Sequence, residues 1–224
     1  MIKVCVFDAY GTLFDVAAAA RAADAEPEFR ALADVWPQVA TDWRSKQLSY
    51  TWLRATASQH VDFWRITQDG LDWALEASGV ATPALRQRLL DLYWELDAYP
   101  EVPNVQSTLK KSGIQTAILS NGTPAMLDAA TASAGIGDRL DALLSVEDVG
   151  VFKPHSSVYD MVGAQFGTNP DEVMFLSSNG WDAAAASGYG FRTVWVNRAG
   201  DPVDRLWAAP DDILTDLSPV PDLI

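Results

Sequence analysis

The sequence predicts an α/β fold, in which a doubly wound parallel sheet carries an all-helical insertion. Five short runs rich in apolar and β-branched residues are typical of buried strands, and a stretch with helical periodicity precedes each of the last four. Strands that alternate with helices favour a parallel sheet covered on both faces. One long segment near the N-terminus contains no convincing strand and is expected to be helical throughout.

The expected elements divide the chain into a core and a cap. The strands are expected at residues 2–8, 114–119, 141–146, 172–177 and 191–196, with helices at 103–112, 124–135, 155–166 and 181–188. Because the helical segment directly follows the first strand, it would sit over the carboxyl ends of the strands, where open parallel sheets bind ligands. We therefore expect residues 1–14 and 99–224 to form the core and residues 15–98 to form a cap subdomain.

The expected cap is rich in tryptophan. It holds six of the nine tryptophans of the chain, and aromatic side chains dominate burial, so each is expected to lie in the core rather than to contact a ligand. The six are Trp36, Trp43, Trp52, Trp64, Trp73 and Trp94.

The charge of the chain restricts the partners that it can bind. Lys and Arg number 16 and Asp and Glu number 30 among 224 residues, giving a formal net charge of −14. Such an acidic chain repels nucleic acids and anionic membrane surfaces, so neither is an expected partner. It also repels small anions at long range. A pocket for an anionic substrate would therefore have to gather positive side chains locally.

Cysteine and histidine are scarce. A single cysteine, Cys5, excludes an internal disulfide, and two histidines cannot complete a Cys/His metal cluster. Cys5 lies in an apolar run and is expected to be a small buried side chain. The N-terminal apolar run is too short for a signal peptide and contains Asp8, and no run is long enough to span a membrane. A cytoplasmic protein is the expectation.

Polar side chains follow four of the expected strands. Taken singly, each has an ordinary explanation: a turn or helix cap for Asp8, turn residues in ILSNG (118–122), a surface lysine for Lys153, which precedes a proline, and a favourable acid in the first helical turn for Asp182. The carboxyl ends of parallel strands meet on one rim, however, so all four groups should lie together. The segments are FDAYGTLFD (7–15), ILSNG (118–122), VFKPHSSVY (151–159) and FLSSNGWDAAAASGYG (175–190).

In this order the motifs resemble the haloacid dehalogenase superfamily and, within it, the L-2-haloacid dehalogenases. The resemblance covers nearly the whole chain and implies a Rossmann-like core with a helical cap. WRSKQLSYTWLR (43–54) is its most specific part, because it lies in the variable cap rather than in the shared core. The other matching segments are DAYGTLFD, LSNG, FKP and SSNGWD.

The resemblance implies a catalytic carboxylate. Asp8 would be the nucleophile, supported by a hydrogen bond from Thr12. Lys153 would pair with Asp8 and would itself be oriented by Tyr159 and Ser177. A carboxylate is a poor nucleophile in bulk water, but a dry pocket beside one lysine strips it of solvent and keeps it ionised.

The resemblance also implies how the substrate would be held. Arg44 would reach down from the cap to the leaving halide, and Asn121 and Trp181 would complete the halide site. Ser120 and nearby backbone amides would hold the substrate carboxylate. Charge moves onto the halogen as its bond to carbon breaks, so fixed donors there would act on the transition state. Arg44 and Lys153 would supply the local positive charge that an anionic substrate needs.

The remaining implied residues complete the pocket. Asn179 and Asp182 would finish the polar network and position water, and Tyr10, Leu48 and Phe63 would form the apolar wall. The implied reaction displaces halide from C2 of a short-chain L-2-haloalkanoic acid with inversion. Water then cuts the ester at the carboxyl carbon of Asp8 and releases a D-2-hydroxy acid. No cofactor and no metal are expected, and the resemblance suggests a homodimer.

Two other functions fit this fold class. A magnesium-dependent phosphatase of the same superfamily typically carries an aspartate two positions after the nucleophile, where this chain has Tyr10, and its fourth segment is more acidic than 177–182. Mg²⁺ prefers ligands that include carboxylates, so this site suits it poorly. A non-catalytic binding protein is the second alternative. The full set of matching polar groups argues against it.

Overall fold

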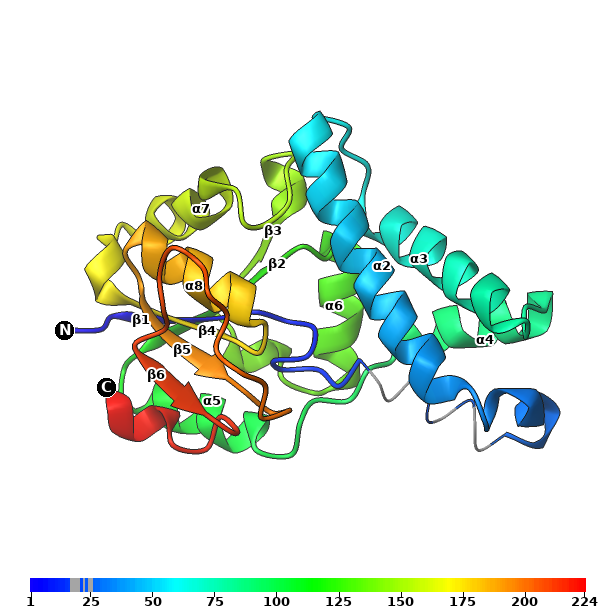
Figure 1. The fold of residues 1–224 in the computed structure, drawn as a ribbon. Helices are drawn as coiled ribbons and strands as arrows, with labels where there is room; N and C mark the ends of the chain where they lie inside the picture. The colour runs from blue at the N-terminus through cyan, green and yellow to red at the C-terminus, as the bar shows by residue number, and fades with distance from the viewer. Residues whose placement is uncertain (17–20, 22, 24–25) are drawn as a thin grey trace.

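The computed structural model describes residues 1–16, 21, 23 and 26–224, drawn as a ribbon in Figure 1. Its centre is a six-stranded sheet in the order β3-β2-β1-β4-β5-β6, and every neighbouring pair of strands is parallel. The order reverses between β1 and β4, which is the topological switch point of such a sheet. The strands are β1 (Val4–Phe7), β2 (Gln115–Ser120), β3 (Ala142–Ser145), β4 (Val173–Ser177), β5 (Arg192–Val196) and β6 (Asp212–Leu214).

Helices cover both faces of the sheet. The chain steps from β1 through β2 to β3 in one direction and then returns to build β4 and β5 on the other side. Right-handed crossovers therefore place α5 (Val102–Lys111) and α6 (Pro124–Ser133) on one face, and α7 (Ser156–Phe166) and α8 (Gly180–Tyr189) on the other (Figure 1). The predicted α/β class, its five strands and its four core helices are confirmed.

The edge strand β6 was missed by the sequence prediction. It has three residues, it begins with a charged side chain and its middle residue, Ile213, is 49% exposed. Sheet pairing with β5 defines this strand, because so short a segment has no periodicity of its own.

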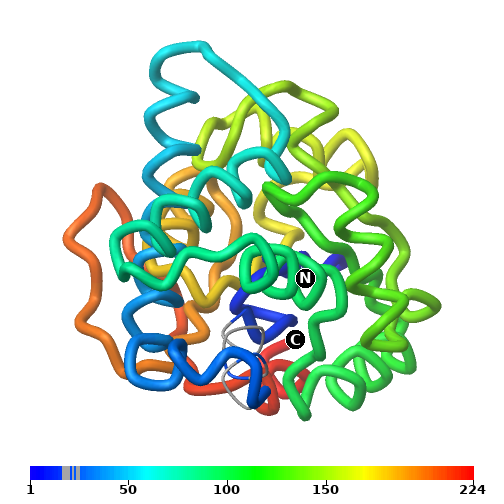
Figure 2. The backbone as a smooth tube through the Cα atoms, turned by 90° about the vertical axis from the view of Figure 1, so that its right-hand side faces the viewer, coloured from blue at the N-terminus to red at the C-terminus, as the bar shows by residue number. Residues whose placement is uncertain are grey.

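Between β1 and α5, every regular element in the described residues is a helix. A 3₁₀ helix, η1 (Pro27–Leu32), precedes α2 (Trp36–Ala57), α3 (Phe63–Ser78) and α4 (Pro83–Trp94). Residues 17–20, 22, 24 and 25 of the expected cap lie outside the described residues. Helices α2, α3 and α4 lie beyond the carboxyl ends of the strands in Figure 1, and Figure 2 views the molecule from their side.

The two ends of this helical segment meet. Phe14 and Ala98 form an antiparallel bridge. On either side of it, the amide of Asp15 donates to the carbonyl of Asp97 at 3.1 Å, and the amide of Tyr99 donates to the carbonyl of Leu13 at 2.9 Å. The chain thus leaves the sheet and returns to it through one paired connection.

Burial confirms one sequence expectation and contradicts part of another. Cys5 is completely buried in β1, and burial raises the pKa of its thiol to about 12. Trp43 is buried, and its indole N–H donates to the carbonyl of Thr67 at 2.8 Å. The expectation of a core position is wrong for Trp52 and Trp73, which are 37% and 39% exposed.

Over the described ranges, no helix combines the length and apolar character needed to cross a membrane.

Candidate active site

The turn after β1 places a carboxylate at the switch point of the sheet. Asp8 directly follows the strand, and its amide still donates to the carbonyl of Leu176 in β4 at 2.8 Å. The chain then turns sharply at Gly11, whose φ of +87° favours glycine and whose α-carbon faces the hydroxyl of Ser178. A Cβ at Gly11 would lie 2.9 Å from that oxygen. The turn brings Thr12 back beside Asp8.

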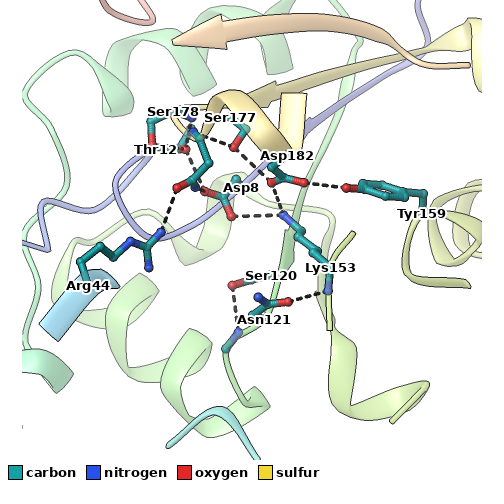
Figure 3. Close-up of polar contacts among 12 residues, drawn as sticks. Asp8, Thr12, Arg44, Ser120, Asn121, Lys153, Tyr159, Ser177, Ser178 and Asp182 are labelled. Carbon is teal, nitrogen blue, oxygen red and sulfur yellow. Dashed lines mark hydrogen bonds and ion pairs between the residues drawn. The ribbon is translucent and has the colours of Figure 1, made fainter. Parts of the chain in front are cut away.

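Both oxygens of the Asp8 carboxylate have donors (Figure 3). Oδ1 accepts from the ammonium of Lys153 at 3.1 Å. Oδ2 accepts from the hydroxyl of Thr12 and from the side-chain amide of Asn179, each at 3.0 Å. The residue is only 7% exposed. The Asp8 carboxylate therefore has little water around it, and protein donors replace that water.

Lys153 joins Asp8 to a second carboxylate. The ammonium lies 2.8 Å from Oδ2 of Asp182, which also accepts from the hydroxyl of Ser177 at 3.1 Å. Oδ1 of Asp182 accepts from the hydroxyl of Tyr159 at 2.8 Å (Figure 3). Burial alone would lower the pKa of Lys153, but the carboxylates of Asp182 and Asp8 raise it above its ordinary value overall.

The partners of Asp182 differ from the sequence expectation. Tyr159 and Ser177 were expected to orient Lys153, but their hydroxyls donate to Asp182 and act on the lysine through that carboxylate. Asp182 was expected to help position water. It is completely buried with both oxygens engaged, and it does not line the cavity above Asp8. Burial raises the pKa of Asp182 and, together with this carboxylate, that of Tyr159, so the phenol stays protonated as a donor.

Helix α2 contributes a guanidinium. Arg44 donates to the side-chain oxygen of Asn179 at 3.1 Å and to that of Gln47 at 2.8 Å. Because Asn179 in turn donates to Asp8, the cation is linked to the carboxylate through one amide. Arg44, Lys153, Asp8 and Asp182 carry two positive and two negative charges, which balance before an anion binds.

A small cavity of about 10 Å³ lies above Asp8. It holds no more than about one water molecule. All ten lining residues belong to the set predicted from the sequence, while Thr12, Tyr159, Ser177 and Asp182 do not line it. The ten are Asp8, Tyr10, Arg44, Leu48, Phe63, Ser120, Asn121, Lys153, Asn179 and Trp181.

Tyr10 forms an aromatic wall of the cavity. Its ring lies 5.4 Å from that of Tyr93 and 5.9 Å from that of Phe63. Burial, reinforced by Tyr93 and Asp8, raises the pKa of its hydroxyl well above the ordinary value, so Tyr10 remains neutral. Gly122 allows this ring to approach, since a Cβ there would lie 2.9 Å from the ring edge. The position that would carry a second acid in a phosphatase therefore belongs to a packed aromatic cluster.

The loop after β2 and the start of α8 supply further polar groups. The hydroxyl oxygen of Ser120 accepts from the amide of Gly122 at 3.0 Å, and the side-chain oxygen of Asn121 accepts from the amide of Lys153 at 3.0 Å. The indole nitrogen of Trp181 is buried and, within the described part of the chain, has no hydrogen-bond partner. An unsatisfied buried donor beside a cavity suits a ligand that accepts hydrogen bonds.

Sequence reasoning missed three residues that hold this site. Gln47 is buried, accepts from Arg44 and donates to the hydroxyl of Tyr93 at 3.0 Å. The amide of Ser178 donates to the hydroxyl of Thr12 at 2.8 Å. Gln47 lies three positions after Arg44 on one helix face, which was a usable signal. Tyr93 lies on α4, and nothing in its sequence surroundings indicates a polar partner.

Comparisons with known proteins agree with these motifs. The haloacid dehalogenase-like hydrolase family matches residues 2–190. (S)-2-haloacid dehalogenase 1 of Pseudomonas sp. strain CBS-3 is 38% identical over 224 residues, covering 100% of this chain and 96% of the relative. (S)-2-haloacid dehalogenase 4A of Burkholderia cepacia is 40% identical over 209 residues, covering 92% and 88%.

Solved structures give the same picture. The L-2-haloacid dehalogenase of Xanthobacter autotrophicus superposes with a TM-score of 0.87 at 35% identity, covering 100% of this chain and 98% of that one. A second structure of that enzyme, with chloropropionic acid covalently bound, gives a TM-score of 0.88. In sequence and in fold, the chain belongs to the haloacid dehalogenase-like hydrolases.

Proposed function

We propose that the protein hydrolyses short-chain L-2-haloalkanoic acids to D-2-hydroxyalkanoic acids and halide, through an ester of Asp8. The observation that carries this proposal is the Asp8 carboxylate, which is buried beneath a small cavity and held by Lys153, Thr12 and Asn179. The substrate class is that of the relatives named above. The covalent chloropropionic acid in one related structure fits a reaction with a covalent step.

The first step is displacement at C2. One oxygen of Asp8 attacks C2 opposite the halogen, a new carbon–oxygen bond forms, and the bonding electrons leave with the halide. The positive charge of Lys153 favours the carboxylate form of Asp8, which keeps a lone pair available for attack. Asp182, Tyr159 and Ser177 hold the lysine in place. Inversion at C2 follows from attack on the side opposite the leaving group.

Donors around the cavity match the two anionic parts of the substrate. Arg44 is permanently charged and, with Asn121 and the unpartnered indole N–H of Trp181, suits the departing halide. Ser120 suits the substrate carboxylate together with backbone amides of its loop. Arg44 and Lys153 balance Asp8 and Asp182, so the site itself adds no net negative charge to the repulsion of an anion by this acidic chain. Tyr10, Leu48 and Phe63 provide an apolar wall for the group on C2.

The second step releases the product. Water attacks the carboxyl carbon of the Asp8 ester, and the bond between that carbon and the oxygen attached to C2 breaks. Asn179 lines the cavity and contacts Asp8, so we assign the positioning of this water to Asn179 rather than to the buried Asp182. C2 keeps the configuration set in the first step.

The proposal includes the arrangement and setting of the enzyme. Residues 1–14 and 99–224 form its core and residues 15–98 its cap, supported by the paired connection at Phe14 and Ala98. The reaction needs no metal, since both buried carboxylates of the site, Asp8 and Asp182, are already paired with Lys153. A homodimer in the cytoplasm completes the proposal.

The test is halide release from L- and D-2-chloropropionate, measured separately with excess chelator, with p-nitrophenyl phosphate as a parallel substrate. We expect release from the L form alone, a rate that chelator leaves unchanged, and no turnover in Asp8→Asn. Phosphatase activity that magnesium restores would favour the phosphatase alternative. The absence of any turnover together with haloacid binding would favour a non-catalytic binding protein.

A further inference from the structure

An apolar groove of about 440 Å³ lies outside the candidate active site. It runs between helix α2 and the core, and most of its lining is aromatic or aliphatic. Trp52 contributes from α2, Phe152 from the segment before α7, Trp181 from α8, and Leu206 and Trp207 from the segment between β5 and β6. The groove is large enough for an alkyl chain of several carbons and offers such a chain apolar contacts.

The groove and the reaction cavity share a wall. Trp181 lines both spaces, and the ring of Trp52 meets that of Trp181 edge-on, with centroids 5.3 Å apart and planes at 85°. On α2, Arg44, Leu48 and Trp52 follow one another at four-residue spacing and so lie on one helix face. Arg44 and Leu48 line the cavity and Trp52 lines the groove. Trp181, with Trp52 packed against it, therefore separates the cavity from the groove.

The two tryptophans of the shared wall, Trp52 and Trp181, differ in how far they are buried. The cavity has room for no more than about one water molecule, so part of its wall must move before a haloacid binds. Trp52 is 37% exposed, so part of its ring already faces solvent. Trp181 is more deeply placed, with a buried indole nitrogen. Trp52 is thus the more exposed member of the pair, and we assign the movement to it.

We propose that the groove is the subsite for the 2-alkyl chain of longer 2-haloalkanoic acids, and that Trp52 limits the chain length that the enzyme accepts. The inference rests on the proposed dehalogenase function and adds a specificity-determining residue to it. The apolar wall of Tyr10, Leu48 and Phe63 receives the methyl group of a 2-halopropionate, whereas a longer chain must displace the indole of Trp52 to reach the groove. With the indole removed, each additional buried methylene improves binding by roughly fourfold.

The kinetic test compares two bromo acids that differ only in chain length. In Trp52→Ala, kcat/KM for L-2-bromohexanoate relative to L-2-bromopropionate should rise by about tenfold or more over wild type. Trp73→Ala is the matched control, because Trp73 is similarly exposed at 39% but packs on Lys46 and lines a separate depression between α2 and α3. The ratio in Trp73→Ala should remain that of wild type.

A second variant fills the groove. Ala55 lines the groove one helical turn from Trp52, so Ala55→Phe in the Trp52→Ala background should abolish the gain for the longer acid. Calorimetric binding of unhalogenated hexanoate and propionate gives a readout that needs no turnover. Hexanoate should gain affinity relative to propionate in Trp52→Ala, keep its wild-type value in Trp73→Ala, and lose the gain in the double variant.

The outcomes separate this inference from the proposed function. If wild type releases halide from L-2-bromopropionate but Trp52→Ala changes neither the kinetic ratio nor hexanoate affinity, the subsite assignment is overturned and the dehalogenase function stands. Equal changes in Trp52→Ala and Trp73→Ala would also overturn it. If no haloacid is turned over while the hexanoate pattern holds, the alkyl subsite stands and the proposed function fails.

Discussion

Replacing Lys153 by methionine removes one buried charge at nearly constant volume. Lys153 is 1% exposed, and its ammonium lies 3.1 Å from Asp8 and 2.8 Å from Asp182. The variant would leave two buried carboxylates without their shared cation, and breaking a buried ion pair in this way costs about 3–5 kcal/mol. Typical domains have only about 5–15 kcal/mol of stability. The burial of Lys153 between two acids therefore predicts a loss of stability in addition to a loss of turnover.

The loss should depend on pH. In Lys153→Met, repulsion and burial raise the pKa of one carboxyl above its unfolded value of about 3.9, so the neutral acid is the better tolerated form. Ionisation of a carboxyl whose pKa is raised on folding destabilises the folded state. The free energy of unfolding therefore falls as the pH rises from the unfolded pKa through the folded pKa. The deficit relative to wild type should therefore be smaller at about pH 5 than at about pH 8.

The assay is urea unfolding of wild type and variant at both pH values. Lys111→Met, which removes the exposed lysine at the end of α5, is the control and should change stability by no more than about 0.5 kcal/mol. Turnover should fall by orders of magnitude in Lys153→Met only. Wild-type unfolding midpoints for Lys153→Met at both pH values would refute the charge network described here.

Three further predictions follow from single contacts. Tyr159→Phe removes the hydroxyl that donates to Asp182 at 2.8 Å, so it should lower the free energy of urea unfolding by about 1.5–3 kcal/mol and should lower kcat. The control Tyr189→Phe removes an exposed hydrogen bond to Asp160 and should leave kcat unchanged. Gln47→Leu leaves Arg44 without one of its two acceptors, and steady-state kinetics should show a lower kcat/KM. The control Gln87→Leu, at an exposed position of α4, should leave kcat/KM unchanged. Because the carboxylates of Asp182 and Asp8 raise the pKa of Lys153 above its ordinary value, its charge persists through mildly alkaline pH, and a pH–rate profile should show no loss from this group there.

The sequence predicted where the site lies, because open α/β sheets bind ligands at the carboxyl ends of their parallel strands. Residues at the carboxyl ends of parallel strands meet on one rim, so Asp8, Ser120 and Ser177 could be brought together from strand positions alone. Individual partners were harder to predict. Tyr159 lies 23 positions before Asp182, and only the packing of α7 against α8 decides that its hydroxyl donates to that acid.

The exposed tryptophans show a second limit. The buried side chains of α2 are Val39, Trp43, Gln47 and Thr51, one every four residues, and Trp52 lies one position off this stripe. Aromatic composition predicted burial for every tryptophan, but the helical period decides which of them face the neighbouring helix. Spacing along α2 therefore held information that composition did not.

The most direct test of the account is a single turnover of L-2-chloropropionate in water enriched in ¹⁸O, with enzyme in excess over substrate. If Asp8 forms the ester and water cuts it at the carboxyl carbon, the hydroxyl oxygen of the product comes from Asp8. The lactate should then carry no label, and mass spectrometry should find one ¹⁸O in the peptide that contains Asp8. Labelled lactate with an unlabelled Asp8 peptide would mean that water attacks C2 directly, and would contradict the nucleophilic role assigned to Asp8.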